Sequence, residues 1–179
     1  MSGHSKWSQI KHKKGISDQK RSAEFGKLAQ AITIAARDNP DPKTNARLKT
    51  AIEKARSLNM PNDNIERAIK RTADKSQGAL EELVIELMAP GNIACIVTAI
   101  TDSRNRTLAE IRAFAHAHGA RIVNPGSLLW MFHKTIAPDG IAYVPNAPMP
   151  LEPATEKKLE TFLSALDDLE DIQDVFINA

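Results

Sequence analysis

The hydrophobic pattern of this 179-residue chain changes its period once, and that change constrains the fold more than any other feature. Up to about residue 73 the apolar side chains recur at the spacing of one helix face, whereas from Leu83 they alternate as in a half-buried strand. The polar segment 75–78 separates the two patterns. The sequence therefore predicts an α+β protein with a helical domain at 1–78 and a compact α/β domain at 79–179.

Charge changes at the same place. Residues 1–78 hold 17 Lys and Arg against 8 Asp and Glu, a net charge of +9, while residues 79–179 hold 7 against 14, a net charge of −7. A basic excess that spans a whole domain favours a polyanionic partner, because such a field concentrates nucleic acid near the surface. The alternative is that these charges are only solvated helix faces.

Composition excludes several classes of protein. Aromatic residues make up 4% of the chain, which argues against base stacking on a broad aromatic sheet as the main binding mode. The single cysteine, Cys95, lies in an apolar run and is expected to be buried. No apolar stretch has the length needed to span a bilayer, and the polar N-terminal segment is unlike a signal peptide. We therefore expect a cytoplasmic protein without membrane contact.

The basic half is predicted to be a basic arm followed by three amphipathic helices. The arm covers residues 1–15, and the helices are expected at about 17–37, 44–58 and 63–71. Thr44 or Asn45 is placed to cap the second helix, and Asp63, with Glu66 three residues later, to cap the third. Three short helices with short links would form a small bundle.

The acidic half is predicted to contain a mixed sheet with helices on one face. Strands are expected around 83–87, at 93–100 in a central position, around Leu128, Trp130 and Phe132, at 141–144 and at 174–177. Helices are expected at 106–118, closed by Gly119, and at 154–170. The connection 137–153 is rich in proline, which rules out a central strand there.

Motifs for catalysis or metal binding are not found. The chain has no glycine-rich phosphate cradle, Cys–His pair or nucleophile elbow. The acidic run Asp167, Asp168, Glu170 and Asp171 lacks the glycine and ligand spacing of a calcium loop, and a solvated helix end is the expected structure. We expect no catalytic residue, metal, cofactor or small-molecule substrate.

Three segments are candidates for contact with nucleic acid. In and after the arm, cationic side chains are placed to neutralise phosphates, and Trp7 is placed either to stack on a base or to pack on the first helix: Lys6, Trp7, Lys11, His12, Lys13, Lys14, Lys20 and Arg21. The third helix would expose Arg67, Lys70 and Arg71. The second and third helices resemble a helix-turn-helix in outline, although a plain helical hairpin is the commoner structure.

The third segment is Thr101–Thr107, which joins the central strand to a helix N-terminus. Backbone N–H groups there, with Arg104, Asn105 and Arg106, could hold a phosphate. Equally, Asn105 or Asp102 could cap the helix while the two arginines pair with acids on the sheet.

Several long motifs together resemble the YebC/PmpR family. They are GHSKW at 3–7, IKHKK at 10–14, NMPNDNIERAIKR at 59–71, TDSRNRT at 101–107, GSLLWMF at 126–132 and LEDIQDVFINA at 169–179. The resemblance implies a helical N-terminal domain followed by α/β domains. Members are described either as DNA-binding transcriptional regulators or as ribosome-associated factors that assist translation through difficult stretches such as proline runs.

The chain departs from that family in two places. Members normally have a further α/β module between the WMF segment and the segment that resembles 142–151, whereas here only residues 133–141 bridge the gap. Members also tend to have a more glycine-rich turn at 88–92. Since the arm, the helices and the TDSRNRT turn are retained, we expect contact with nucleic acid to be retained as well.

The predicted function is that of a nucleic-acid-binding regulator of gene expression. A ribosome-associated translation factor contacting rRNA or tRNA phosphates is favoured, because sequence readers with this helix arrangement commonly dimerise and no dimerisation segment is obvious. The alternative is a DNA-binding transcriptional regulator. A third reading is a protein–protein adaptor that binds through its acidic half. The expected partners are ribosomal RNA or DNA, and the ribosome.

Overall fold

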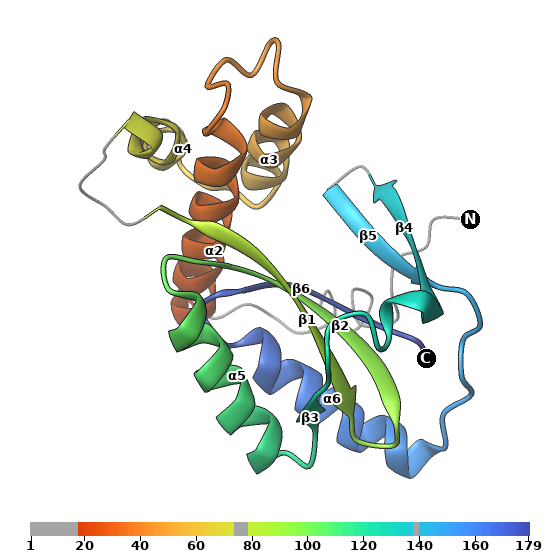
Figure 1. Ribbon diagram of the computed structural model, residues 1–179. Coiled ribbons are helices and arrows are strands. Elements are labelled where there is room, and N and C mark those ends of the chain that lie inside the picture. The colour runs from red at the N-terminus through yellow and green to blue at the C-terminus, as the bar shows by residue number, and fades with distance from the viewer. Residues whose placement is uncertain (1–17, 74–78, 138–139) are drawn as a thin grey trace.

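The computed structural model describes residues 18–73, 79–137 and 140–179 (Figure 1). In chain order the helical part contains α2 (Asp18–Ala36), α3 (Ala46–Ser57), α4 (Asn62–Lys70) and a 3₁₀ turn (Arg71–Ala73). The remainder contains β1 (Glu81–Ala89), β2 (Ile93–Thr101), α5 (Arg104–Ala117), β3 (Arg121–Ile122), a 3₁₀ turn (Leu129–Met131), β4 (Phe132–Ala137), β5 (Gly140–Pro145), α6 (Pro153–Asp167) and β6 (Ile172–Ile177). The predicted α+β class is confirmed.

Helix α2 is the centre of the helical part. Its buried side chains, including Leu28 and Ile32, pack with Leu48 of α3 and Ile65 of α4 in one apolar cluster. Asn45 caps α3, as the sequence predicts: its side-chain oxygen accepts the N–H of Leu48 at 3.0 Å. The same side chain donates to the carbonyl of Ala35, so the cap also fastens α3 to the end of α2.

The predicted cap of α4 is wrong. Pro61, not Asp63, is the N-cap residue, and its carbonyl accepts the N–H groups of Asn64 and Ile65. The reason lies in the preceding turn. Asn59 has a φ of 61°, and Met60 N–H donates back to Ala55 O at 2.9 Å, so the chain turns sharply and α4 begins one residue earlier than predicted.

The main sheet has the strand order β3-β1-β2-β6, and every described neighbouring pair is antiparallel. The predicted mixed sheet is therefore wrong. Helix α5 returns the chain to the far side of β1, so β3 runs parallel to β2 but never pairs with it, and α6 delivers β6 to the other side of β2 in the opposite direction. β2 is central and almost fully buried, as predicted.

Two layers cover the sheet. Helices α5 and α6 lie on one face, where Ile111, Phe162 and Leu166 pack on the apolar side chains of the strands. The other face is covered at one end by α2, through Ile34, and at the other end by Leu128 and the β4–β5 hairpin. The helical part thus forms half of the second layer, which the sequence pattern does not predict.

The segment predicted as a strand with three inward side chains is mostly a turn. Leu128 and Phe132 are buried, whereas Trp130 is 72% exposed, because Leu129–Met131 form a 3₁₀ turn. A strand would place residues 128, 130 and 132 on one face, but a helical turn places the middle residue on the opposite side.

The proline-rich connection begins with a two-stranded hairpin. β4 and β5 pair antiparallel from Phe132↔Pro145 to Ala137↔Gly140. This confirms the predicted short strand at 141–144 and places it where the family's further module is expected. In the described parts of the chain, no helix combines the length and apolar character needed to cross a bilayer.

Candidate nucleic-acid interface

Helix α4 presents a cationic face to solvent. Its buried residues Ile65 and Ala68 face α2, and Thr33 of α2 donates to the carbonyl of Ala68 at 2.9 Å. Of the predicted residues, Arg67 and Lys70 are exposed on the helix, whereas Arg71 begins the 3₁₀ turn that follows it and is half-buried. Lys70 pairs weakly with Glu66 at 3.8 Å, while the two arginines form no ion pair with the described residues. Like charges four residues apart repel each other, so an anion near this face would be favoured.

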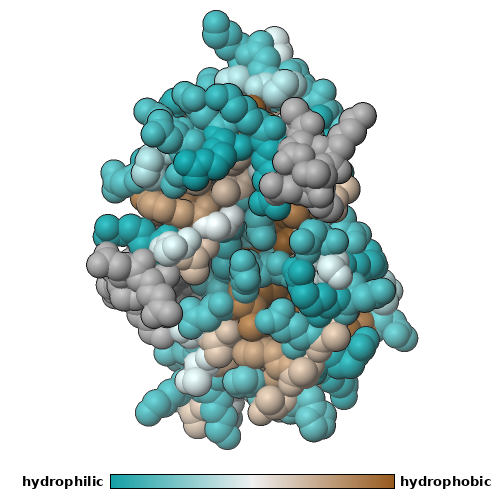
Figure 2. Space-filling view, turned by 90° about the vertical axis from the view of Figure 1, so that its left-hand side faces the viewer, coloured by the Kyte–Doolittle hydropathy of each residue, from teal (hydrophilic) through white to brown (hydrophobic). Residues whose placement is uncertain are grey.

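The surface around α4 is hydrophilic. α4 lies on the left of Figure 1, the side that Figure 2 turns toward the viewer. The upper part of that face is mostly polar, and hydrophobic residues show between the polar ones lower down (Figure 2). This distribution suits contact with a hydrated polyanion better than contact with an apolar partner.

Part of the basic excess is neutralised inside the molecule. Among the described residues, three ion pairs join the helical part to the rest of the chain: Lys27–Asp167, Arg47–Glu82 and Lys54–Asp174. The first is largely shielded from solvent, since its side chains are 12% and 15% exposed. The opposite charges of the two halves therefore help the halves to pack against each other, and not all of the basic side chains are available to a partner. The net charge alone does not show this.

The arm lies outside the described residues, as do its predicted contacts Lys6, Trp7, Lys11, His12, Lys13 and Lys14. The side chain of Lys20 is also outside the described part, whereas Arg21 is exposed in the second turn of α2. Arg21 is twelve residues before Thr33, which contacts α4, and this corresponds to about 18 Å along a helix. Arg21 and the α4 cations are thus not gathered at one point.

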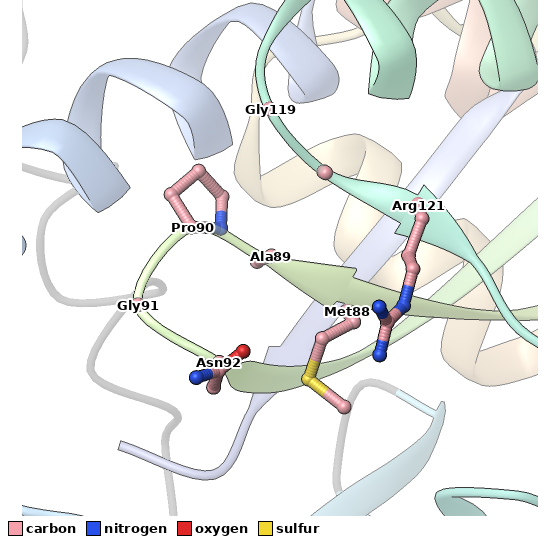
Figure 3. Close-up of a pocket in the computed structure, with 8 residues that line it drawn as sticks. Met88, Ala89, Pro90, Gly91, Asn92, Gly119 and Arg121 are labelled. Atoms are coloured by element: carbon pink, nitrogen blue, oxygen red, sulfur yellow. The ribbon is translucent and has the colours of Figure 1, made fainter.

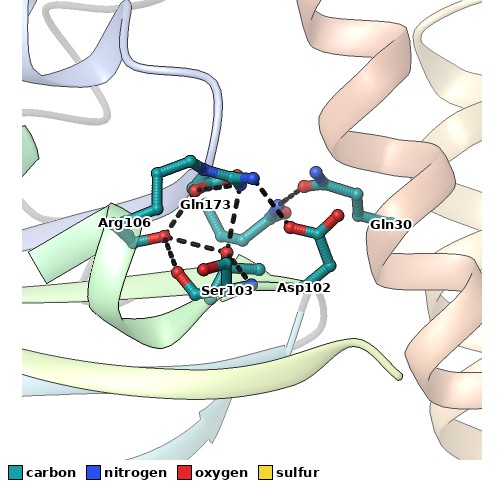
Figure 4. Close-up of polar contacts among 8 residues, drawn as sticks. Gln30, Asp102, Ser103, Arg106 and Gln173 are labelled. Atoms are coloured by element: carbon teal, nitrogen blue, oxygen red, sulfur yellow. Dashed lines mark hydrogen bonds and ion pairs between the residues drawn. The ribbon is translucent and has the colours of Figure 1, made fainter. Parts of the chain in front are cut away.

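The TDSRNRT turn holds a hydrogen-bond network whose acceptor, Asp171, is buried while Arg106 and Asp102 reach solvent (Figure 4). Arg106 Nη2 lies 3.0 Å from Asp171 Oδ2, and Arg106 Nη1 lies 2.8 Å from Asp102 Oδ1. Thr107 Oγ1 donates to Asp171 Oδ2 at 2.5 Å, and Thr101 Oγ1 accepts the N–H of Ser103 at 2.9 Å. The hydrogen bond to Asp171, with the charge of that carboxylate, raises the pKa of Arg106 above its ordinary value.

This geometry favours the second of the two readings of the turn. Arg106 is engaged with two carboxylates, and Arg104 lies 3.8 Å from Glu81. Neither Asp102 nor Asn105 caps α5: the N-cap is Ser103, without a side-chain hydrogen bond to the helix. Asn105 is exposed. We therefore infer that Arg106 stabilises the fold through its two carboxylate partners. Phosphate contact by Arg104 and Asn105 stays a prediction.

Asp171 is the residue that sequence reasoning misplaced. It was expected at a solvated helix end, yet it is only 4% exposed and its backbone oxygen also accepts the N–H of Ile100. Asp168 and Glu170 in the same run are exposed. The sequence contains only an indirect sign that Asp171 is buried: Arg106 and Thr107 follow a buried strand and need a hydrogen-bond acceptor there.

Glu86 is a second buried acid that the sequence did not mark. It lies on β1 at 3% exposure and accepts the N–H groups of Gly126, Leu128 and Leu129. Three hydrogen bonds to one carboxylate fix the turn that precedes β4. A glutamate that alternates with apolar residues on a strand normally faces solvent, so the sequence pattern of β1 did not indicate that Glu86 is buried.

A shallow pocket beside the β1–β2 turn does not have the features of a small-molecule site (Figure 3). Its volume is about 160 Å³, and residues 88–92 and 119–121 line it. Arg121 is its only charged side chain. A drug-sized ligand needs a deeper cavity of about 300 Å³ or more. Within the described residues, no group of three or more His, Cys, Asp and Glu is placed to hold a metal ion.

Comparison with known proteins identifies the family. Residues 5–75 match the family described as "TACO1/YebC protein N-terminal domain", and residues 80–137 match "TACO1/YebC second and third domain". A "probable transcriptional regulatory protein" of Brachyspira hyodysenteriae is 50% identical over 137 residues, which is 75% of this chain and 56% of the relative. The chain thus spans little more than half the length of such relatives.

Two longer matches cover almost the whole chain. A "probable transcriptional regulatory protein" of Pseudothermotoga lettingae is 33% identical over 236 aligned positions, covering 99% of this chain and 93% of the relative. The crystal structure of a conserved hypothetical protein from Aquifex aeolicus has a TM-score of 0.86 and 30% identity, covering 96% of this chain and 95% of that one.

The Pseudothermotoga protein is longer than this chain within the aligned region. The 236 aligned positions exceed the 179 residues of this chain by 57, so the Pseudothermotoga protein has at least that many residues without a counterpart here. The matches over the helical part, the sheet and nearly the full length show that the chain belongs to the TACO1/YebC family.

Proposed function

We propose that this protein is a regulator of gene expression that binds nucleic acid through the phosphate backbone, and that it acts as a translation factor associated with the ribosome. The observation that carries the proposal is that Arg67, exposed on α4, and the half-buried Arg71 just after it form no ion pair with the described residues, while several other cations of the helical part do. Arginines that the fold does not use remain available for phosphates.

A DNA-binding transcriptional regulator is the second candidate. Two observations favour it: the curated relatives are named as probable transcriptional regulatory proteins, and α3 and α4 form a helix pair with only residues 58–61 between them. A sequence reader would use Asn64, Arg67 and Arg71 on base edges and would prefer one DNA sequence by about 10³-fold or more. A backbone binder would discriminate poorly.

The test is the salt dependence of binding. The double variant Arg67→Ala, Arg71→Ala is titrated against labelled rRNA fragments and against duplex DNA at several salt concentrations. If both arginines contact phosphates, the slope of log K against log salt should fall by about 1.4 on single strands and about 1.8 on duplex DNA.

The matched control is Lys157→Ala, Lys158→Ala, which removes the same charge from exposed positions in α6. Equal effects of the two pairs would show that only net charge matters, and an unchanged slope for the α4 pair would contradict the proposed interface. Co-sedimentation with ribosomes combined with weak discrimination among DNA sequences supports the translation role. Strong preference for one DNA sequence supports the transcription role instead.

A further inference from the structure

Trp130 is the most conspicuous exposed aromatic side chain in the described structure. It is 72% exposed, in a chain that contains only two tryptophans. It is also held in place: its indole Nε1 donates to the carbonyl of Ser127 at 2.8 Å, and its own carbonyl accepts the side-chain amide of Asn146 at 2.9 Å. The indole is therefore displayed in one orientation.

The turn beneath Trp130 is anchored from inside. The carboxylate of Glu86 accepts the N–H groups of Gly126, Leu128 and Leu129, and the buried side chains Leu128 and Phe132 fix the turn on the sheet. A ligand that stacks on this indole would not need to order the loop first, so most of its contact energy would be available for binding.

The charge of the surrounding segment differs from that of the rest of the acidic half. Residues 79–179 have a net charge of −7, yet residues 119–151 hold two cations, Arg121 and Lys134, against one acid, Asp139. A fixed aromatic face in a segment that escapes the acidic excess of the rest of this half is a combination that suits single-stranded nucleic acids.

Other exposed apolar residues do not belong to the same feature. Ile136 and Ile141 pair with each other next to the hairpin turn, and Ile136 is 90% exposed. Four residues of strand separate Ile136 from Phe132, which is about 13 Å. These isoleucines also have no π-face on which a base could stack.

We propose that Trp130 is a stacking platform for one unpaired base of a single-stranded nucleic acid, a second contact separate from the α4 face. This inference rests on the proposed function and adds to it that the ligand is single-stranded where it meets the sheet. The turn before β4 and helix α4 lie on opposite sides of Figure 1, so the two contacts can be removed independently.

The experiment uses the intrinsic fluorescence of Trp130 in the full-length Trp7→Phe protein, where it is the only tryptophan. Three probes are titrated: oligouridylate of about ten nucleotides, an abasic phosphate–sugar strand of equal length, and duplex RNA. We expect quenching by oligouridylate alone. Trp130→Ala should weaken binding of oligouridylate by about 5- to 100-fold without altering the salt slope, because the lost contact is stacking and not charge.

Two variants serve as controls. Trp130→Phe keeps a smaller aromatic face and should restore part of the affinity, whereas Ile136→Ala removes an exposed apolar side chain from the hairpin that follows the turn and should leave the affinity unchanged. Since Trp130 is mostly exposed, Trp130→Ala should keep its melting temperature. If the melting temperature of Trp130→Ala falls, the proposal is still tested by how the three probes quench the fluorescence of the intact Trp130.

The outcomes separate the inference from the proposed function. Unquenched Trp130 fluorescence and unchanged affinity of Trp130→Ala, with weakened binding of the Arg67→Ala, Arg71→Ala protein, would overturn the platform alone. Loss of ribosome co-sedimentation with unchanged affinity for free RNA would assign Trp130 to a protein contact and also overturn it. Failure of the unaltered protein to bind any nucleic acid at low salt would contradict both the stacking platform and the proposed function.

Discussion

Arg106 Nη2, in the first turn of α5, lies 3.0 Å from Oδ2 of Asp171, the residue that directly precedes β6. The two residues are 65 positions apart in the chain. Their contact joins the point where β2 becomes α5 to the point where the last strand enters the sheet, and Ile100 N–H donates to the backbone of Asp171 beside it. The TDSRNRT motif is thus a tertiary junction at one edge of the sheet.

Asp171→Ala should destabilise the protein by about 2 to 3 kcal/mol, because the buried hydroxyl of Thr107 loses its carboxylate acceptor and Arg106 loses its buried partner. Urea unfolding followed by circular dichroism measures the change. Glu170→Ala, at an exposed neighbouring acid, should stay within about 0.5 kcal/mol. Similar values for the two variants would mean that the network contributes nothing.

Glu86→Ala should cost about 3 kcal/mol or more, since three backbone N–H groups of the turn before β4 lose one shared acceptor. In the Trp7→Phe background the fluorescence anisotropy of Trp130 should fall as the turn loosens. Glu82→Ala is the matched control, because it removes an exposed glutamate from the same strand and face. Unchanged anisotropy in Glu86→Ala would show that the turn before β4 keeps its conformation without Glu86.

Cys95 should react with thiol reagents only when the protein unfolds, because burial raises the pKa of its thiol and the side chain is fully covered. The sign of the pH effect follows. Above the ordinary pKa of 9.0 the unfolded chain loses the thiol proton while the folded protein keeps it, so folding stability falls with rising pH.

The difference between the wild-type protein and Cys95→Ala isolates this contribution. Over the alkaline range, wild-type stability should decline more steeply by about 1.4 kcal/mol per pH unit, and below pH 8 the difference between the two should be constant. Parallel pH profiles above pH 9, or rapid labelling of the native protein, would contradict the burial of Cys95.

An insertion of about ten Gly and Ser residues between positions 138 and 139 should cost only about 1.5 kcal/mol, the entropy of the longer loop. The residues that flank this point, Ala137 and Gly140, pair across the hairpin, so longer relatives can add a module there without disturbing the sheet. Thermal unfolding measures the change.

The same insertion after Gly91 is the comparison. Gly91 has a φ of +82°, and a Cβ there would lie 2.4 Å from Cγ2 of Thr155 in α6, so this turn is packed tightly against its neighbour. Insertion should therefore be clearly more damaging than at the hairpin. Equal costs would remove the structural reason for placing the lost module at the β4–β5 turn.

The sequence predicted most of the elements and the family. Helix α2, the central strand β2 and the cap at Asn45 follow from side chains only a few residues apart, and the structure confirms them. The errors at Trp130 and Asp171 arose where distant contacts override local pattern, whereas the cap of α4 was decided by the turn just before it. Asp63 lost its capping role to Pro61, Trp130 left the predicted strand face, and Asp171 moved from solvent into a buried network.

The amino-acid order by itself determined most of the helices and strands, the change from a basic to an acidic half, and the membership of the family, because these depend on composition and on spacing along the chain. Only the tertiary structure decided which acids are buried, which cations remain at the surface and that one indole faces solvent. Those outcomes depend on groups such as Glu86 and Leu128, 42 residues apart, or Arg106 and Asp171, which meet only after the sheet has closed. A buried carboxylate and a solvated one look the same in a sequence, and they differ only in what the fold brings within hydrogen-bonding distance.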